Sequence, residues 1–189
     1  MKNALTISGY NTRLRPVTLA DAEFIVQLRN MPHVLGTVGD TSHQIADQRQ
    51  WIESYLYRPD DYYFIVESLQ GQPWGTIGTY NFKGDTAECG RFVMVPGILA
   101  ALPGSVLNFR LAFEQLGLAE VRTEVVSDNA KVLSLNRRLG LHQVGVAYRS
   151  RFIQGKWIDM VQFEMSRNQW LDAYKKLHSL AEVAGRTLK

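Results

Sequence analysis

Residues 87–144 alternate between apolar segments of strand composition and segments of helical periodicity, and glycine, proline or polar residues stand at each junction. Such strand–helix–strand crossovers bring backbone N–H groups and helix N-termini to one edge of a sheet. An edge of this kind can hold a phosphate-bearing ligand. The order of these segments therefore predicts an α/β domain with a ligand site at the junctions.

The length and composition favour one soluble domain. The 189 residues, 46% of them hydrophobic and 21% charged, suffice for a single core. The formal charge of +3 is mild and the basic residues are scattered, so we expect no nucleic-acid partner, although the positive balance suits an anionic ligand. The N-terminus has no apolar segment of signal-peptide length and no long apolar run occurs, which predicts a cytoplasmic protein without a membrane partner.

Cysteine and histidine are too sparse to suggest a metal centre. The single cysteine, Cys89, excludes an internal disulfide and a cysteine-based zinc site. The spacing of His33, His43, His142 and His178 matches no metal-ligand pattern. We therefore predict no metal, and we expect Cys89 to be a small packed residue rather than a nucleophile.

Periodicity and chain-breaking residues locate the other elements. Residues 1–11 are interpreted as a lead-in. Strands are expected over residues 14–17, 62–68, 74–82, 87–95, 121–126, 143–154 and 156–165. Helices are expected over residues 20–30, after Ser42, over 105–116, from Asn129 to Gly140, and over 168–184.

Four motifs occur in the order found in a known family. They are Leu14-Arg15-Pro16 before an acidic helix, residues 87–90 opening a central strand, residues 112–118 running into 121–125, and residues 129–132 followed by 139–141. Together they resemble the GCN5-related N-acetyltransferase (GNAT) superfamily over about residues 12–170. Within it, the chain is most similar to ribosomal-protein N-terminal acetyltransferases and amino-sugar N-acetyltransferases.

This resemblance implies the GNAT fold: a mixed, mostly antiparallel sheet of about six to seven strands flanked by helices. The domain would span residues 12–170, with a C-terminal helix and tail over 171–189. The resemblance also implies acetyl-CoA as co-substrate and direct attack of a primary amine in a ternary complex. Such a site must hold the acyl donor, stabilise negative charge on the carbonyl oxygen and take a proton from the amine.

The family holds the pyrophosphate on a loop that corresponds here to residues 96–105. The family pattern has Gln or Arg at its first position, Gly at its fourth, and Gly or Ala at its sixth. These positions fall here on Pro96, Leu99 and Ala101, and only Ala101 fits the pattern. A phosphate nest depends on amide geometry rather than on particular side chains, so acetyl-CoA is still the expected ligand. The resemblance implies as cofactor-binding residues Val93, Met94, Val95, Leu99, Ala100, Ala101, Gly104, Ser105 and Asn129, the last also a predicted helix N-cap.

Three residues are candidates for the chemistry. Glu88 corresponds to a carboxylate that relays the amine proton through water, the alternative being a strand-edge charge facing solvent. Asn136 stands where many members carry a tyrosine that protonates the leaving thiolate. Asparagine cannot act as that acid but can donate a hydrogen bond to sulfur; the alternative is a solvent-facing helix residue. His33 lies where the family builds its acceptor pocket and is a candidate base or a surface histidine.

The acceptor is expected to be a nucleotide-linked amino sugar or a protein N-terminus. Tyr80, Asn81 and Tyr148 are candidates for acceptor contact, although aromatic strands are more often core. A diphosphate would need cationic partners, and the candidates are Arg149, Arg151 and Lys156.

Two further questions stay open. Because the loop pattern and the tyrosine are both missing, a catalytically degenerate binding protein on the same fold is the alternative function. The final helix carries apolar residues on one broad face, and it could dock on its own sheet or form a homodimer.

Overall fold

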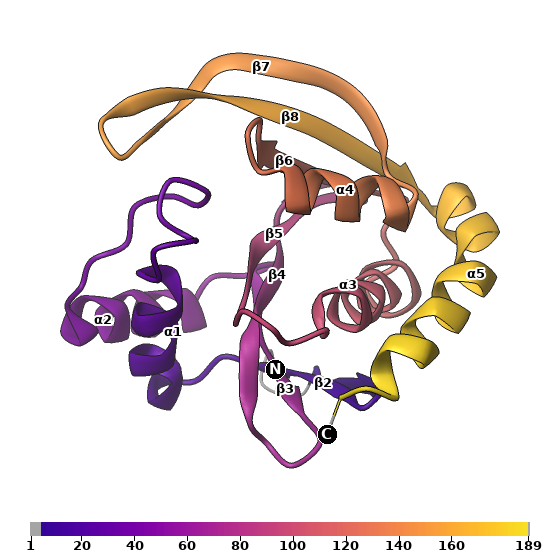
Figure 1. Ribbon diagram of the computed structural model, residues 1–189, viewed down its shortest axis with the longest axis horizontal. Helices are drawn as coiled ribbons and strands as arrows, with labels where there is room; N and C mark the ends of the chain where they lie inside the picture. Colours follow the sequence, from indigo (N-terminus) through magenta and orange to yellow (C-terminus); the bar gives the residue numbers. More distant parts are fainter. Residues whose placement is uncertain (1–4, 189) are drawn as a thin grey trace.

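The computed structural model describes residues 5–188, in which helices cover both faces of one sheet (Figure 1). Eight strands are joined in the order β1-β2-β3-β4-β5-β6-β8-β7. The expected six to seven strands are therefore corrected to eight in this part of the chain, because the lead-in contains a short strand that pairs with the next one. The strands are β1 (Ile7–Gly9), β2 (Thr12–Pro16), β3 (Tyr62–Ser68), β4 (Pro73–Lys83), β5 (Thr86–Met94), β6 (Glu120–Val126), β7 (His142–Ile153) and β8 (Lys156–Ser166).

The helices divide the core into two layers. The helices are α1 (Ala22–Arg29), α2 (Ile45–Leu56), α3 (Ala101–Arg110), α4 (Ala130–Leu139) and α5 (Arg167–Gly185). One cluster of buried residues joins α1 and α2 to β3. The larger cluster lies on the other face, under α3 and α5 (Figure 1). The apolar face of the final helix therefore packs on its own domain.

Helix α3 begins four residues earlier than its predicted start at Ser105. Pro103 falls in the first turn, where its missing N–H costs no intrahelical hydrogen bond. Gly104 allows the helix to lie close to β3, because a Cβ there would stand 3.2 Å from Val66 Cγ1. After Arg110 the helix continues as a π-helical turn over Leu111–Gln115. The helical segment therefore starts earlier than expected, whereas its end lies one residue before the predicted Leu116.

The pair β5 and β6 creates the opening that matters for function. These strands are parallel and connected through α3, whereas every other neighbouring pair in the described sheet is antiparallel. Their pairing runs from Thr86↔Glu120 to Glu88↔Arg122 and then ends. Beyond that point the strands diverge (Figure 1). We call the gap between Cys89–Met94 of β5 and Thr123–Val126 of β6 the seam.

Arg15 fastens β2 to the turn that precedes α1. Its two Nη atoms donate to the carboxylate oxygens of Asp21 at 2.8 and 2.7 Å, and its Nε donates to Glu67 at 2.9 Å. Asp21 also accepts from the backbone N–H of Thr18 at 2.8 Å, within a capping box. Burial alone would raise the pKa of Asp21, but the hydrogen bonds from Arg15 and Thr18 outweigh burial and lower it.

We expect Asp21→Asn to destabilise the protein by about 2 kcal/mol at neutral pH, because it removes charge-assisted hydrogen bonds. A carboxylate whose pKa is lowered by folding stabilises the protein above its unfolded pKa of about 3.9 and loses that contribution as the pH falls through the folded value. Urea unfolding of both proteins at about pH 7 and about pH 3 measures the effect. A difference that stays constant between the two pH values would contradict this account.

Candidate active site

A cavity of about 380 Å³ follows the seam. The two diverging strands supply Glu88–Phe92 from β5 and Thr123–Val126 from β6. Side chains of α3, α4 and β4 close its sides, together with the loop after α1 and the β7–β8 hairpin. The place where the sheet opens is therefore also the place where a ligand can enter.

Glu88 stands at the last paired position of β5, at the entrance to the seam. The Tyr80 hydroxyl donates to its Oε1 at 2.8 Å, and Asn81 Nδ2 donates to its Oε2 at 2.9 Å. Burial and the nearby Glu88 carboxylate raise the pKa of Tyr80 far above its ordinary value, so the phenol stays protonated and donates. Glu88 is half-buried, and side chains of β4 donate to both of its carboxylate oxygens.

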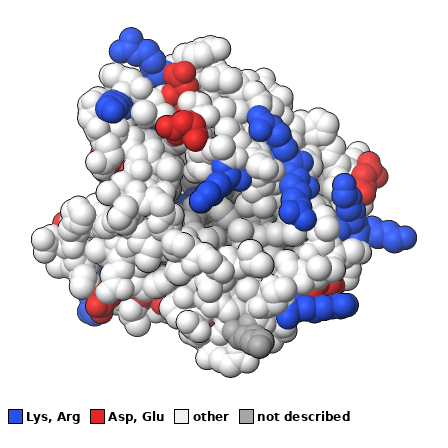
Figure 2. All heavy atoms as spheres, in the orientation of Figure 1, with Lys and Arg blue, Asp and Glu red and all other residues white. Residues whose placement is uncertain are grey.

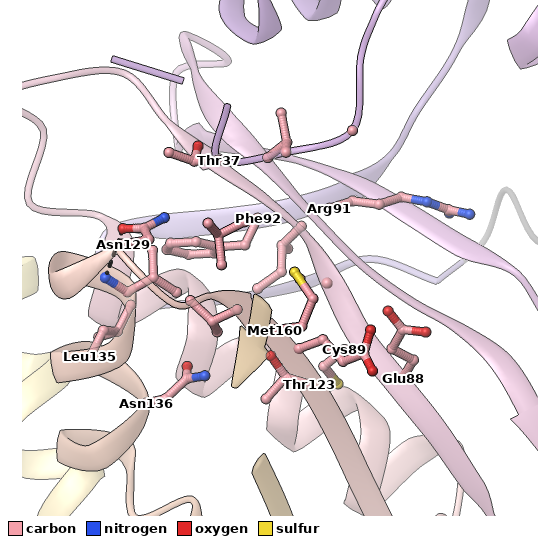
Figure 3. Close-up of a pocket in the computed structure, with 18 of the residues that line it drawn as sticks. Thr37, Glu88, Cys89, Arg91, Phe92, Thr123, Asn129, Leu135, Asn136 and Met160 are labelled. Carbon is pink, nitrogen blue, oxygen red and sulfur yellow. Dashed lines mark hydrogen bonds between the residues drawn. The ribbon is translucent and has the colours of Figure 1, made fainter. Parts of the chain in front are cut away.

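Asn136 brings an unused donor to the cavity. The residue is 6% exposed, and its Nδ2 has no hydrogen-bond partner within residues 5–188. Figure 3 shows it on the α4 side of the cavity, which Thr123 of β6 also lines. An unsatisfied buried N–H is costly, which points to a ligand acceptor at this position. The alternative of a solvent-facing helix residue is wrong.

Asn129 caps α4 as its sequence context predicts. Its Oδ1 accepts from the backbone N–H of Val132 at 3.3 Å (Figure 3). The same residue lines the cavity. Capping uses only the side-chain oxygen, so the amide nitrogen is available for a second contact.

Cys89 is buried against α3. Thr79 Oγ1 lies 3.5 Å from its Sγ, and Asn108 Nδ2 donates to the sulfur at 3.4 Å. Burial raises the pKa of the Cys89 thiol to about 12. Since the thiolate is the reactive form of cysteine, this residue is suited to packing and not to nucleophilic catalysis, as predicted.

The loop after α1 touches the β7–β8 turn across the cavity. The Asp40 carboxylate accepts from Gln154 Nε2 at 2.7 Å and from the Gln154 backbone N–H at 3.3 Å. Residues 37–39 of this loop and residues 151–153 of the hairpin line the cavity on either side of the contact. We call this contact between Asp40 and Gln154 the clasp.

Residues 11–142 match the family model described as the acetyltransferase (GNAT) domain. The chain belongs to the GNAT acetyltransferase family. It is therefore an N-acetyltransferase, and the family implies acetyl-CoA as the acetyl donor. A related sequence is the prophage-derived N-acetyltransferase YokL of Bacillus subtilis (strain 168), 25% identical over 128 residues, which are 66% of this chain and 72% of YokL.

Solved GNAT structures share the fold of this protein. FdhC, described as a nucleotide-linked sugar GNAT, has a TM-score of 0.76 at 23% identity, covering 91% of this chain and 96% of FdhC. A variant of spermidine N-acetyltransferase SpeG from Vibrio cholerae has a TM-score of 0.76 at 18% identity, covering 88% and 99% of the two chains. A GCN5-related N-acetyltransferase from Brucella melitensis has a TM-score of 0.78 at 17% identity, covering 95% and 84%.

The cavity of this GNAT protein is lined by six of the fifteen catalytic, cofactor-binding and substrate-binding residues predicted from sequence. Those that line it are Glu88, Asn136, Asn129, Ser105, Tyr80 and Asn81. The other predicted cofactor residues (Val93, Met94, Val95, Leu99, Ala100, Ala101 and Gly104) continue from the cavity along β5 into the first turn of α3. His33 and Tyr148 are exposed, the latter 77%, and neither is among the lining residues.

Sequence reasoning missed three charged residues of the GNAT cavity: Arg29, Arg91 and Glu124. Arg91 adopts a left-handed backbone with φ of 51° in a bulge of β5. No sequence pattern marked this bulge. Arg29 ends α1, and the fold of the following loop brings its side chain to the cavity.

Neither a metal cluster nor a membrane span is found in the part of the GNAT chain that the structure describes. Within residues 5–188, no three His, Cys, Asp or Glu side chains are grouped to hold a metal ion. No helix in the same range is both long and apolar enough to cross a membrane.

Proposed function

We propose that this protein transfers the acetyl group of acetyl-CoA to a primary amine on a nucleotide-linked amino sugar, by direct attack within a ternary complex. The observation that carries the proposal is the seam, where the unpaired edge of β5 begins beside the Glu88 carboxylate. The same cavity is lined by Asn136, whose Nδ2 has no hydrogen-bond partner within residues 5–188. The seam and Asn136 suit the acyl donor, and the Glu88 carboxylate suits the amine.

The seam fits the extended, amide-containing arm of acetyl-CoA. Beyond Glu88, the β6-facing backbone groups of β5 have no strand partner in the described sheet. A ligand with its own amides can satisfy such an edge as an added strand would. Phe92, Val125 and Leu135 supply apolar walls. Bound there, acetyl-CoA would present its acetyl thioester to the attacking amine.

The phosphates would lie at the start of α3. The first intrahelical bond in this turn runs from Gly104 N–H to Ala100 C=O at 2.8 Å. The N–H groups of Ala101 and Leu102 are therefore left for a ligand, at the positive end of the helix dipole. Figure 2 shows Lys and Arg side chains on the α4 side of the hollow on this face. The basic residues of α4 are Lys131, Arg137 and Arg138.

The residues that face the seam divide the chemistry between them. As the N–C bond forms and the C–S bond breaks, Glu88 takes the amine proton, directly or through one water. Backbone N–H groups of β5 in the seam stabilise the negative charge on the carbonyl oxygen. Asn136 Nδ2 donates a hydrogen bond to the sulfur, which leaves as a thiolate.

Arg29 supports an acceptor that carries a diphosphate. Its Nε donates to Thr41 Oγ1 at 2.6 Å and its Nη2 to the Gly39 carbonyl at 3.0 Å, but no carboxylate within residues 5–188 pairs with it. Arg151 also lines the cavity, but its Nη2 donates to Glu124 at 2.8 Å. A guanidinium without a carboxylate partner is the better anion site, so Arg29 is a better candidate than Arg151. Arg149 and Lys156 are exposed and are not among the lining residues. The fold is shared with FdhC, a nucleotide-linked sugar GNAT.

A protein N-terminus is a less favoured acceptor because of the clasp. A peptide needs an open groove for the residues that follow its first one, whereas Asp40 and Gln154 meet across the cavity. A small molecule can enter beside this contact without breaking it.

The test is release of the CoA thiol with a panel of amines: UDP-linked amino sugars, the free amino sugars, spermidine and a short peptide. We expect at least one UDP-linked amino sugar to exceed its free sugar by about 10-fold or more in kcat/KM. Faster turnover of the peptide or of spermidine would reject the acceptor class. Tight binding of acetyl-CoA with no turnover of any amine would instead favour a binding protein on this scaffold.

Replacing Asn129 with serine is expected to weaken acetyl-CoA binding about 5-fold with stability changed by only a few tenths of a kcal/mol. Serine caps a helix about as well as asparagine, but it lacks the amide nitrogen that would reach the cofactor. Titration calorimetry and urea unfolding of the same sample separate the two roles. Unchanged affinity would restrict Asn129 to capping.

A further inference from the structure

Two consecutive residues of β4 each donate a hydrogen bond to one carboxylate oxygen of Glu88. Tyr80 Oη donates to Oε1 at 2.8 Å, and Asn81 Nδ2 donates to Oε2 at 2.9 Å. In a regular strand, consecutive side chains point to opposite faces of the sheet. A shared target for Tyr80 and Asn81 therefore requires a local departure from strand geometry.

A bulge supplies that departure. Pairing between β4 and β5 passes from Tyr80↔Glu88 to Lys83↔Thr86, so β4 has one residue more than β5 over this interval. Asn81 lies within the bulge with φ of 53°. Asparagine tolerates this left-handed conformation better than most residues do. The extra residue turns the Asn81 amide toward Glu88.

Tyr80 is itself fixed from the neighbouring strand. Its hydroxyl end lies over Gly90. A Cβ added at Gly90 would stand 2.2 Å from Tyr80 Oη, so a side chain there would clash with the phenol. The Arg91 guanidinium lies 4.1 Å from the centroid of the Tyr80 ring, a cation–π distance. Arg91 is held in turn by Asp61, with Nη2 donating to Oδ2 at 3.0 Å and Nη1 donating to Oδ1.

We propose that Tyr80 and Asn81 are positioning residues that aim the Glu88 carboxylate at the reacting amine, in place of the acceptor contacts expected from sequence. Each carboxylate oxygen has a second lone pair. Tyr80 and Asn81 each occupy one lone pair of a Glu88 carboxylate oxygen. The plane of the carboxylate is therefore fixed, and its remaining lone pairs point in a constant direction. The inference rests on the proposed role of Glu88 as proton acceptor.

Two substitutions remove one donor each and keep the scaffold. Tyr80→Phe retains the ring under Arg91, and Asn81→Gly retains the left-handed backbone. We expect each to lower kcat about 10-fold, since misorientation of a reacting group is costly. KM for acetyl-CoA and for the acceptor should stay within about 2-fold, because neither residue is proposed to bind a substrate.

Thermal unfolding verifies that each variant is folded. Asn81→Asp, which keeps the shape and sets a second carboxylate against Glu88, is a further variant and should lose at least as much.

The deciding measurement combines each substitution with Glu88→Gln. If Tyr80 and Asn81 act through Glu88, each should change kcat by less than about 2-fold in the Glu88→Gln protein. A full 10-fold loss in that background, or a rise in acceptor KM at constant kcat, would overturn the inference. If Tyr80→Phe and Asn81→Gly turn over at the wild-type rate while Glu88→Gln is slow, the positioning role of Tyr80 and Asn81 is overturned. The proposed role of Glu88 would then stand. Wild-type turnover by Glu88→Gln would remove the proposed role of Glu88 and the inference with it.

Discussion

Replacing Glu88 with glutamine is expected to lower kcat about 100-fold, with KM for acetyl-CoA within about 2-fold of the wild-type value. Glutamine has almost the same shape and can still accept the Tyr80 hydrogen bond, but it cannot take a proton from the amine. Only the proton-transfer step should therefore suffer. Steady-state release of CoA thiol, with the best amine from the acceptor panel, measures both constants.

Glu124→Gln is the matched control for this experiment. Glu124 lines the same cavity, but its carboxylate accepts from Gln162 at 3.0 Å and from Arg151 at 2.8 Å. Burial would raise the pKa of Glu124, but these hydrogen bonds outweigh burial and lower it, which makes Glu124 a poor proton acceptor. We expect Glu124→Gln to keep kcat within about 3-fold. Equal losses in the two variants would contradict the assignment of Glu88.

Ala101→Asp is expected to raise the Kd for acetyl-CoA about 30-fold without destabilising the protein. Residue 101 is the first residue of α3, where an acidic side chain interacts favourably with the helix dipole. The same carboxylate would repel the phosphates of the cofactor by about 2 kcal/mol at an effective dielectric constant of about 20. The substitution should therefore weaken acetyl-CoA binding, measured by titration calorimetry, and leave stability, measured by thermal unfolding, unchanged.

Ala101→Asn separates charge from size at the same position. Asparagine is about as large as aspartate but neutral, so its Kd should lie within about 3-fold of the wild-type value. If asparagine weakens binding as much as aspartate does, crowding rather than repulsion is responsible. If neither variant changes the Kd, the phosphates do not lie at the start of α3.

Much of the fold could be predicted because local patterns determine it. Apolar periodicity located seven of the strands, and turn residues located the hairpin at Gln154-Gly155. Capping preferences correctly placed the start of α4 at Asn129. The strand β1 was missed because three residues carry too little periodicity to be recognised. The start of α3 was missed because Pro103 can end one segment or occupy the first turn of the next.

The candidate site was less predictable because it depends on contacts between distant segments. The bulges at Asn81 and Arg91 follow from the register between β4 and β5, which neither strand specifies alone. The clasp joins Asp40 to Gln154, 114 positions along the chain. By contrast, the family resemblance was sufficient to single out Glu88 and Asn136, which both line the cavity; their roles stay predictions.

Isothermal titration of the purified protein with acetyl-CoA, with CoA as the control ligand, tests the central claim most directly. The claim is that the seam and the start of α3 hold this donor even though Pro96 and Leu99 replace the usual loop residues. We expect one site per chain with a Kd of about 1–100 µM. Absence of binding at about 1 mM acetyl-CoA would contradict the account, because no donor would then be held beside Glu88.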